Sequence, residues 1–217
     1  SYFLSPIGYI YIGVFLLTCS IFFYLDIFVN LSTDFPYMFG SAVTILTFIV
    51  PLITMRMFSE ERKNGTEQLL LTSPRSITQI VLGKFVAATL VVLVSVLLTL
   101  IYFGILSYFG EPQLGKSLIA TLGFALLSIA YVSFGMFASS LTENQVVSAV
   151  ITIAVFVLLW FLPSFSSIFI DFSLMEAFFE SFYLGTISIK NLVLLVSFTV
   201  LFVVFTIMVL QRRKSVK

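Results

Sequence analysis

The residues whose types and spacing suit chemistry are concentrated between Arg56 and Lys84. The chain of 217 residues has 11 Lys and Arg and 10 Asp and Glu, and eight of these charged residues lie in this one segment. Carboxylates and guanidinium groups at this density form ion pairs with one another or bind complementary charges on a partner. In a chain with only 10% charged residues, we interpret the segment as a surface in water that contacts another protein.

A second string, from Gly110 to Ser117, matches the phosphate-binding pattern G-x-x-x-x-G-K-[ST]. That chemistry requires a β-strand that leads through the glycine-rich loop into a soluble helix, whose backbone amides bind the phosphates. Here the string lies between two long apolar stretches, and no part of the chain is left to build a nucleotide domain. We interpret the match as coincidental.

Other catalytic chemistries lack their residues. The chain has no histidine, and Cys19 is its one cysteine, which excludes Ser–His catalysis and thiolate or imidazole metal sites. No Asp, Glu, Lys or Arg falls in the middle of an apolar run, so a proton or ion relay has no visible carrier. We therefore expect a chain that is not an enzyme and has no catalytic, cofactor-binding or metal-binding residues.

The elements that must position the charged segment are membrane spans. Hydrophobic residues make up 60% of the chain and its mean hydropathy is +1.16, whereas soluble domains are about 45–50% apolar. Six charge-free runs are each long enough to cross a bilayer as a helix. The sequence predicts an all-α polytopic membrane protein that is a single transmembrane domain over 1–217. Its six transmembrane helices are expected near 7–25, 38–57, 84–106, 117–138, 146–162 and 191–210.

The basic residues predict how the chain is oriented. Six spans place both termini on one side together with the Arg56–Lys84 segment, and only Lys116 and Lys190 fall on the other side. The positive-inside rule then places the termini and the charged segment in the cytoplasm. We expect a multi-pass protein of a plasma or inner membrane, bacterial in origin. Because the basic residues lie where the topology needs them, the net charge of +1 does not indicate a nucleic-acid partner.

Within the charged segment, a short cytoplasmic helix is expected near 64–73. Asn64 is a typical N-cap residue, and Glu67 follows it at the spacing of a capping box. The neighbouring Glu60 and Glu61 add acidic charge, which is unfavourable beside an anionic lipid surface. The pattern therefore favours a protein partner over a surface for lipid headgroups. Glu143, the single charge in the loop 139–145, is expected to add a minor contact to the same partner.

Two prolines fall at positions where they shape the spans. Pro51 lies inside the second span and predicts a kink, which is either a flexing point for gating or a tolerated proline in a packed membrane helix. Pro163 ends the fifth span. Beyond it, segment 162–190 has aromatic residues at three- and four-residue steps, with Glu180 among them. This pattern predicts helices that lie in the outer interface or dip back from it, or aromatic residues that only anchor the bundle there.

Short strings of defined residues accompany the apolar runs, and most lie in or next to the charged segment. They are Val50-Pro51-Leu52-Ile53-Thr54-Met55-Arg56, Glu60-Glu61-Arg62, Gly65-Thr66-Glu67-Gln68-Leu69-Leu70, Ser73-Pro74 and Gly83-Lys84, with Ser5-Pro6-Ile7-Gly8-Tyr9 and Phe179-Glu180-Ser181-Phe182 elsewhere. With these strings the chain resembles the permease subunits of the type-2 ABC exporter family. Within that family it is most similar to the gliding-motility and nitrous-oxide-reductase maturation permeases. The resemblance covers nearly the whole chain.

The resemblance implies a non-catalytic permease whose coupling helix, between the second and third spans, docks on a separate ATPase. Two permeases, identical or different, would pair in the membrane with two ATPase copies, which bind ATP and Mg²⁺. ATP hydrolysis would then drive export of an unidentified substrate, with hydrophobic or amphipathic molecules as candidates. The resemblance assigns ATPase coupling to Glu60, Glu61, Arg62, Gly65, Thr66 and Glu67, with Glu143 added, and gating or exit to Pro51, Pro163 and Glu180.

One alternative class stays open from the sequence. A membrane scaffold, or an immunity or sensor protein that binds a ligand without transport, would have the same spans. An adjacent gene for a soluble ATPase would distinguish the two classes. A membrane-embedded enzyme is disfavoured, because the catalytic groups are missing.

Overall fold

A computed structural model of the chain describes residues 6–29, 34–68, 75–164 and 173–215. In this part of the chain the regular elements are all helical. Six helical stretches, some of them made of two successive helices, are long and apolar enough to cross a membrane. This result confirms the expected all-α architecture and the number of candidate spans. These six candidate spans are Gly8–Ile27, Pro36–Lys63, Ile77–Tyr108, Leu114–Leu141, Gln145–Ser164 and Ile189–Ser215.

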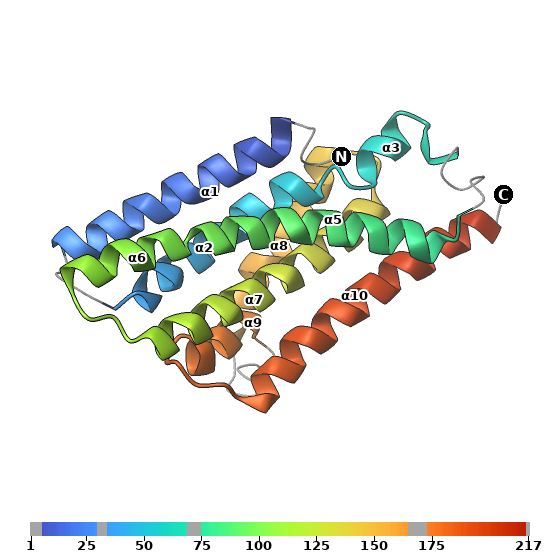
Figure 1. The fold of residues 1–217 in the computed structure, drawn as a ribbon. Helices are drawn as coiled ribbons and strands as arrows, with labels where there is room; N and C mark the ends of the chain where they lie inside the picture. The colour runs from blue at the N-terminus through green and yellow to red at the C-terminus, as the bar shows by residue number, and fades with distance from the viewer. Residues whose placement is uncertain (1–5, 30–33, 69–74, 165–172, 216–217) are drawn as a thin grey trace.

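The long helices run up and down in one bundle, and short helices occupy the connections (Figure 1). In chain order the elements are α1 (Pro6–Tyr24), the π-helix η2 (Leu25–Val29), α2 (Pro36–Thr54), α3 (Ser59–Lys63), α5 (Ile77–Leu98), α6 (Leu100–Phe109), α7 (Leu114–Leu141), α8 (Gln145–Phe161), the 3-10 helix η3 (Leu162–Ser164), α9 (Leu174–Ala177), the π-helix η5 (Phe178–Phe182) and α10 (Ile189–Ser215).

The start of α5 differs from the expected span start at residue 84. Ser76 caps the helix: its hydroxyl accepts from the backbone N–H of Gln79 at 3.2 Å, and the Gln79 side chain accepts from the Ser76 N–H at 3.3 Å. This capping box satisfies backbone donors at the N-terminus and fixes the helix start at Ile77. Lys84, which marks the edge of the apolar run in the sequence, therefore lies inside the helix.

Helix α7 is the centre of the bundle, because α2, α5, α8 and α10 all pack against it. Glycines at two of its positions allow close approach. A Cβ atom at Gly135 would lie 2.2 Å from Thr54 Oγ1 of α2, and a Cβ atom at Gly123 would lie 2.1 Å from Phe182 Cβ of η5. The helices of this bundle can therefore adopt their observed spacing only with residues this small on α7.

Aromatic side chains fill the half of the bundle that receives η5. Phe124 of α7 stacks on Phe39 of α2, with ring centroids 4.7 Å apart, and Phe178 of η5 approaches the same ring edge-on at 6.2 Å. Phe124 lies ten residues after Leu114, the first residue of α7, or about 15 Å along the helix axis. The short helices before α10 therefore reach back into the bundle, in agreement with the dipping arrangement expected from the sequence. Residues 165–172 of that segment lie outside the described residues.

The two ends of the bundle differ in the elements they carry. The start of α1, helix α3 and the C-terminal end of α10 lie at one end, which we call the α3 end (Figure 1). The α6–α7 connection lies at the opposite end, where Lys116 of α7 forms an ion pair with Asp34 at 2.7 Å; we call this the Lys116 end. An even number of spans places the first and last helix ends at the same end of the bundle, as observed here. The arrangement also brings the charged segment close to the C-terminal end of α10.

Candidate functional site

The charged segment at the α3 end begins where α2 ends. Met55 closes α2 with a hydrogen bond from its N–H to the carbonyl oxygen of Pro51 at 2.8 Å. The chain then turns and forms α3, a helix of five residues. We call residues 55–68 the α3 segment.

Asn64 ends α3 rather than beginning a helix, so the expected N-cap role of Asn64 is wrong. Its N–H donates to the carbonyl oxygen of Glu60 at 3.0 Å. Gly65 follows with φ of +70°, a left-handed conformation in which glycine commonly terminates a helix. Thr66 then donates from Oγ1 to the carbonyl oxygen of Glu61 at 3.1 Å. A new helical segment begins at Glu67; residues 69–74, which include the second half of the coupling helix expected near 64–73, lie outside the described residues.

Ser139 of α7 joins the end of α2 to the start of α3. Its hydroxyl accepts from the N–H groups of Phe58 and Ser59 at 3.0 and 3.1 Å and donates to the carbonyl oxygen of Met55 at 3.0 Å. The Ser59 hydroxyl donates to the carbonyl oxygen of Ser139 at 3.0 Å. Both serines are fully buried. The capping residue of α3 thus comes from another helix, 80 positions away, and no local sequence pattern indicates it.

Lys84 of α5 contacts the same connection between α2 and α3. Its ammonium forms an ion pair with Glu61 at 2.5 Å and also donates to the carbonyl oxygen of Met57. The ammonium lies 4.4 Å from the ring centroid of Phe58, a cation–π contact. These three contacts account for a cation inside a helix of a candidate span.

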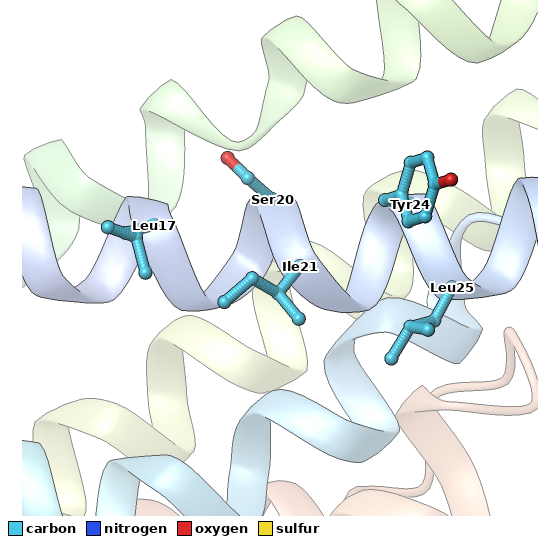
Figure 2. Close-up of a pocket in the computed structure, with 5 residues that line it drawn as sticks. All are labelled: Leu17, Ser20, Ile21, Tyr24 and Leu25. Carbon is cyan, nitrogen blue, oxygen red and sulfur yellow. The ribbon is translucent and has the colours of Figure 1, made fainter.

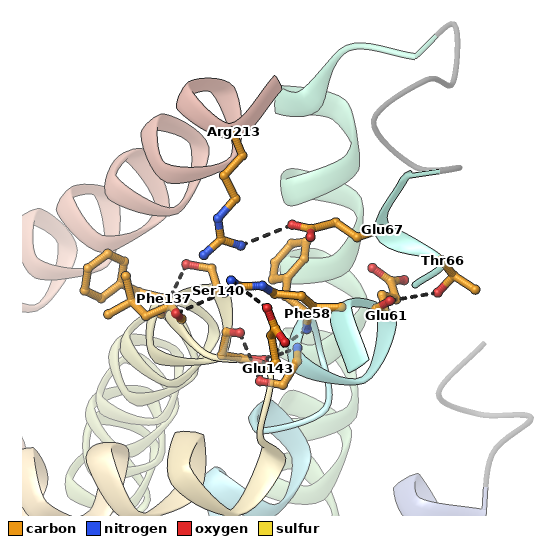
Figure 3. Close-up of polar contacts among 12 residues, drawn as sticks. Phe58, Glu61, Thr66, Glu67, Phe137, Ser140, Glu143 and Arg213 are labelled. Atoms are coloured by element: carbon orange, nitrogen blue, oxygen red, sulfur yellow. Dashed lines mark hydrogen bonds and ion pairs between the residues drawn. The ribbon is translucent and has the colours of Figure 1, made fainter. Parts of the chain in front are cut away.

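Arg62 connects the α3 segment to the α7–α8 turn, which the sequence shows as two separate loops. It forms an ion pair with Glu143 of the α7–α8 turn at 2.8 Å and donates to the carbonyl oxygen of Leu141 at 3.1 Å. Glu143, for which the sequence predicts only a minor contact, is therefore a direct partner of the α3 segment. Figure 3 shows Glu143 beside the α3 segment, with Phe58 and Glu61.

A third ion pair links the α3 segment to the last helix. Arg213 near the end of α10 donates to Glu67 at 3.1 Å, and the dashed line between them is visible in Figure 3. The α3 segment is thus paired with α5, with the α7–α8 turn and with α10. Each pair combines residues that are far apart in the sequence.

These three ion pairs occupy several of the charged side chains that the sequence predicts would bind the ATPase. Glu61, Arg62 and Glu67 are engaged within the chain, and Glu60 is partly buried. Four residues at the turn are exposed to solvent. They form what we call the α3 tip: Lys63, Asn64, Gly65 and Thr66. The structure therefore separates the residues that hold the segment in place from those that face outward.

The residues to which gating or exit is assigned, Pro51, Pro163 and Glu180, lie in separate parts of the bundle. Pro51 is buried inside α2, four residues before Met55, toward the α3 end. Pro163 lies in η3, after the end of α8, and Glu180 is exposed in η5. The last two belong to the elements near the Lys116 end.

The Lys116 end has its own close packing. Gly185, with φ of +81°, lies against Lys116, and a Cβ atom there would be 2.7 Å from Lys116 Cγ. Burial, together with the negative charge of Asp34, raises the pKa of Tyr183 above its ordinary value. The Tyr183 phenol therefore stays protonated and neutral at physiological pH.

A pocket of about 660 Å³ lies along the face of α1 and the start of η2. Figure 2 shows its side chains on this one helical stretch. The Ser20 hydroxyl already bonds with the Tyr102 hydroxyl at 2.6 Å, so the pocket offers an apolar surface with no reactive group. Its lining residues are Leu17, Ser20, Ile21, Tyr24 and Leu25. Among the described residues, no three or more His, Cys, Asp or Glu lie together as a metal site.

The fold and the α3 end define a polytopic helical membrane protein with a charged, internally paired segment at one end of its bundle. The model of the family described as ABC-2 family transporter protein matches residues 38–215, which include the α3 segment and every helix from α5 to α10. The chain belongs to this family, and it is a transmembrane permease subunit of an ABC transporter. No curated protein matches the chain.

Proposed function

We propose that this permease couples ATP hydrolysis by a separate ATPase subunit to export of a substrate, with the α3 tip as the contact for the ATPase. One observation carries the proposal: the α3 segment forms ion pairs with α5, with the α7–α8 turn and with α10. A force applied to this segment would reach three parts of the bundle at once. Such connections are what a coupling element needs.

The partners follow from the same proposal. Two ATPase copies, each holding ATP and Mg²⁺, would act on a pair of permeases, either two copies of this chain or this chain and a related one. The α3 end would face the cytoplasm of a bacterial cell, because Arg62, Lys63 and the exposed Arg212 and Lys214 lie there. Within the family, the proposed branch is that of the gliding-motility and nitrous-oxide-reductase maturation permeases.

The chemistry of the contact differs from the expectation based on the sequence strings. Glu61 and Glu67 are neutralised by Lys84 and Arg213, so we propose that they position the α3 segment instead of binding basic residues of the ATPase. The exposed tip offers the Lys63 ammonium, the Asn64 amide and the Thr66 hydroxyl. A surface of this kind fits a partner with hydrogen-bonding groups and a carboxylate.

Movement of the α3 segment would enter the bundle through α2. Pro51 lacks the N–H of a regular helix position, so α2 can bend there more easily than elsewhere. Pro163 and Glu180 would then belong to the exit at the Lys116 end. The spans have no charged group at mid-depth, which suits a hydrophobic or amphipathic substrate.

Photo-crosslinking in native membranes tests the proposal. A photoreactive amino acid in place of Thr66 should capture an ABC ATPase, identified by the nucleotide-binding motifs in its peptides. The same amino acid in place of Tyr108, which is 91% exposed near the Lys116 end, is the matched control and should capture none. Equal capture of an ATPase from both positions, or from neither in a complex that hydrolyses ATP, would overturn the contact. If no ATPase associates with the chain at all, a scaffold or sensor is the better description.

A further inference from the structure

Ser139 joins α3 to α7 through backbone groups, whereas the other connections of the α3 segment are mainly made by side chains. The Ser139 hydroxyl accepts from two N–H groups and donates to one carbonyl group, which uses its full hydrogen-bonding capacity. A five-residue helix such as α3 cannot be stable alone. Its geometry is therefore imposed by α7.

A second set of contacts holds α3 to the same part of the bundle. Leu141 is the last residue of α7, and its carbonyl oxygen accepts a hydrogen bond from Arg62. Arg62 also forms an ion pair with Glu143, two residues beyond the end of α7. Together with Ser139, these contacts bind both ends of α3 to the final turn of α7 and the α7–α8 turn. Relative movement between α3 and this region would break the buried hydrogen bonds of Ser139 with Phe58 and Ser59 at once, whereas the more exposed Arg62–Glu143 pair adds less.

The connections to α5 and α10 are of another kind. Lys84 and Arg213 reach the α3 segment with long side chains that have several rotatable bonds. Such pairs can follow a shift by changing rotamers, and both remain partly exposed to water, which lowers the energy of rearrangement. A displacement of α3 would therefore strain these two links less than the junction at Ser139.

We propose that Ser139 is a positioning residue that makes α3, the end of α7 and the α7–α8 turn one rigid lever, which moves as a single body when the ATPase moves. This inference rests on the proposed function, because it assumes that the ATPase acts on α3. It assigns the transmission of the ATPase stroke to α7 and α8.

The first experiment compares two adjacent serines in the complex of permease and ATPase. Ser139 and Ser140 are both fully buried, but the Ser140 hydroxyl donates within α7 to the Phe137 carbonyl oxygen at 2.7 Å and, among the described residues, has no hydrogen bond to α3. Ser140→Ala is therefore the matched control for Ser139→Ala; Ser140 and Phe137 are labelled in Figure 3. The readout is the change that Mg²⁺ and ATP cause in maleimide labelling of Leu184→Cys, an exposed position near the Lys116 end.

We expect Ser139→Ala to reduce the ATP-dependent change in labelling at least fivefold while ATP hydrolysis continues, and Ser140→Ala to leave both unchanged. An equal response of the two variants would overturn the role of Ser139. A parental protein (Leu184→Cys alone) whose labelling never responds to ATP, although an ATPase is bound, would instead contradict the proposed function.

A disulfide provides a test that does not depend on weakening the fold. The hydroxyl oxygens of Ser59 and Ser139 lie 3.2 Å apart, so cysteines at these two positions are close enough for a disulfide. In a Cys19→Ala/Leu184→Cys background, the reduced Ser59→Cys/Ser139→Cys variant lacks the Ser139 hydroxyl and should have lost the ATP-dependent change in labelling. Oxidation should restore that change, because the disulfide replaces the junction between α3 and α7. A response that is present in the reduced protein and lost on oxidation would show that α3 moves against α7 and would overturn the lever.

Discussion

Arg213 donates a hydrogen bond to Glu67 at 3.1 Å across 146 positions of the chain. The side chains are 25% and 16% exposed, so the pair is partly shielded from water. It connects the helical segment that begins at Glu67 with the last turn of α10. The charged segment and the C-terminal end of the described chain are therefore linked directly at the α3 end.

Reversing either charge of this pair should destabilise the protein. Glu67→Arg or Arg213→Glu places two like charges next to each other at the α3 end, and the double variant restores an opposite pair. We expect a coupling energy of about 1 kcal/mol, at the upper end for partly exposed pairs. A double-mutant cycle on thermal unfolding in detergent measures it. Arg212→Glu at the exposed neighbouring position is the control and should be close to neutral; a double variant no more stable than the two singles would refute the pair.

Close helix contacts at α7 predict the effect of adding one methyl group. Gly123→Ala and Gly135→Ala would place Cβ atoms 2.1 and 2.2 Å from atoms of Phe182 and Thr54. Overpacking of this kind costs about 1–3 kcal/mol. Gly83→Ala in α5 is the matched control, because no atom lies within 4 Å of its Cβ position and alanine favours a helix. The melting temperature should fall for the first two variants and stay or rise for the third; a uniform response would show that α7 is packed less closely.

The turn at Gly65 predicts a purely conformational effect. No atom lies within 4 Å of a Cβ atom built at Gly65, yet its φ is +70°. Gly65→Ala should therefore strain the backbone by about 1–2 kcal/mol, whereas asparagine adopts this region more readily. Hydrogen exchange of the amides at 62–67 should accelerate in Gly65→Ala and change little in Gly65→Asn. Identical exchange in the two variants would be inconsistent with a left-handed turn.

The six spans could be predicted because apolar runs and charged boundaries are properties of single segments. The exceptions have physical causes. Lys84 interrupts the charge-free run but not the helix, because Glu61 and the Met57 carbonyl oxygen bind its ammonium. Asn64 suits an N-cap by residue type. The Gly65 that follows favours a helix end, and this signal could have corrected the expectation.

The candidate site was only partly predictable for a similar reason. The density of charge around α3 is visible in the sequence, but the partners of Glu67 and Arg62 are at Arg213 and Glu143, far along the chain. Ser139 is one of many small polar residues in the spans, and nothing local distinguishes it. Contacts between distant helices depend on how the bundle packs, so single-segment reasoning cannot assign them.

The most direct test of the central claim is the side of the membrane on which the α3 tip lies. Lys63→Cys and Tyr108→Cys place single exposed thiols at the α3 tip and near the Lys116 end, while the native Cys19 is buried. In intact cells, a membrane-impermeant maleimide should label Tyr108→Cys and leave Lys63→Cys unmodified until the membrane is permeabilised. Labelling of Lys63→Cys from outside intact cells would place the tip beyond the reach of any cytosolic ATPase and would contradict the account.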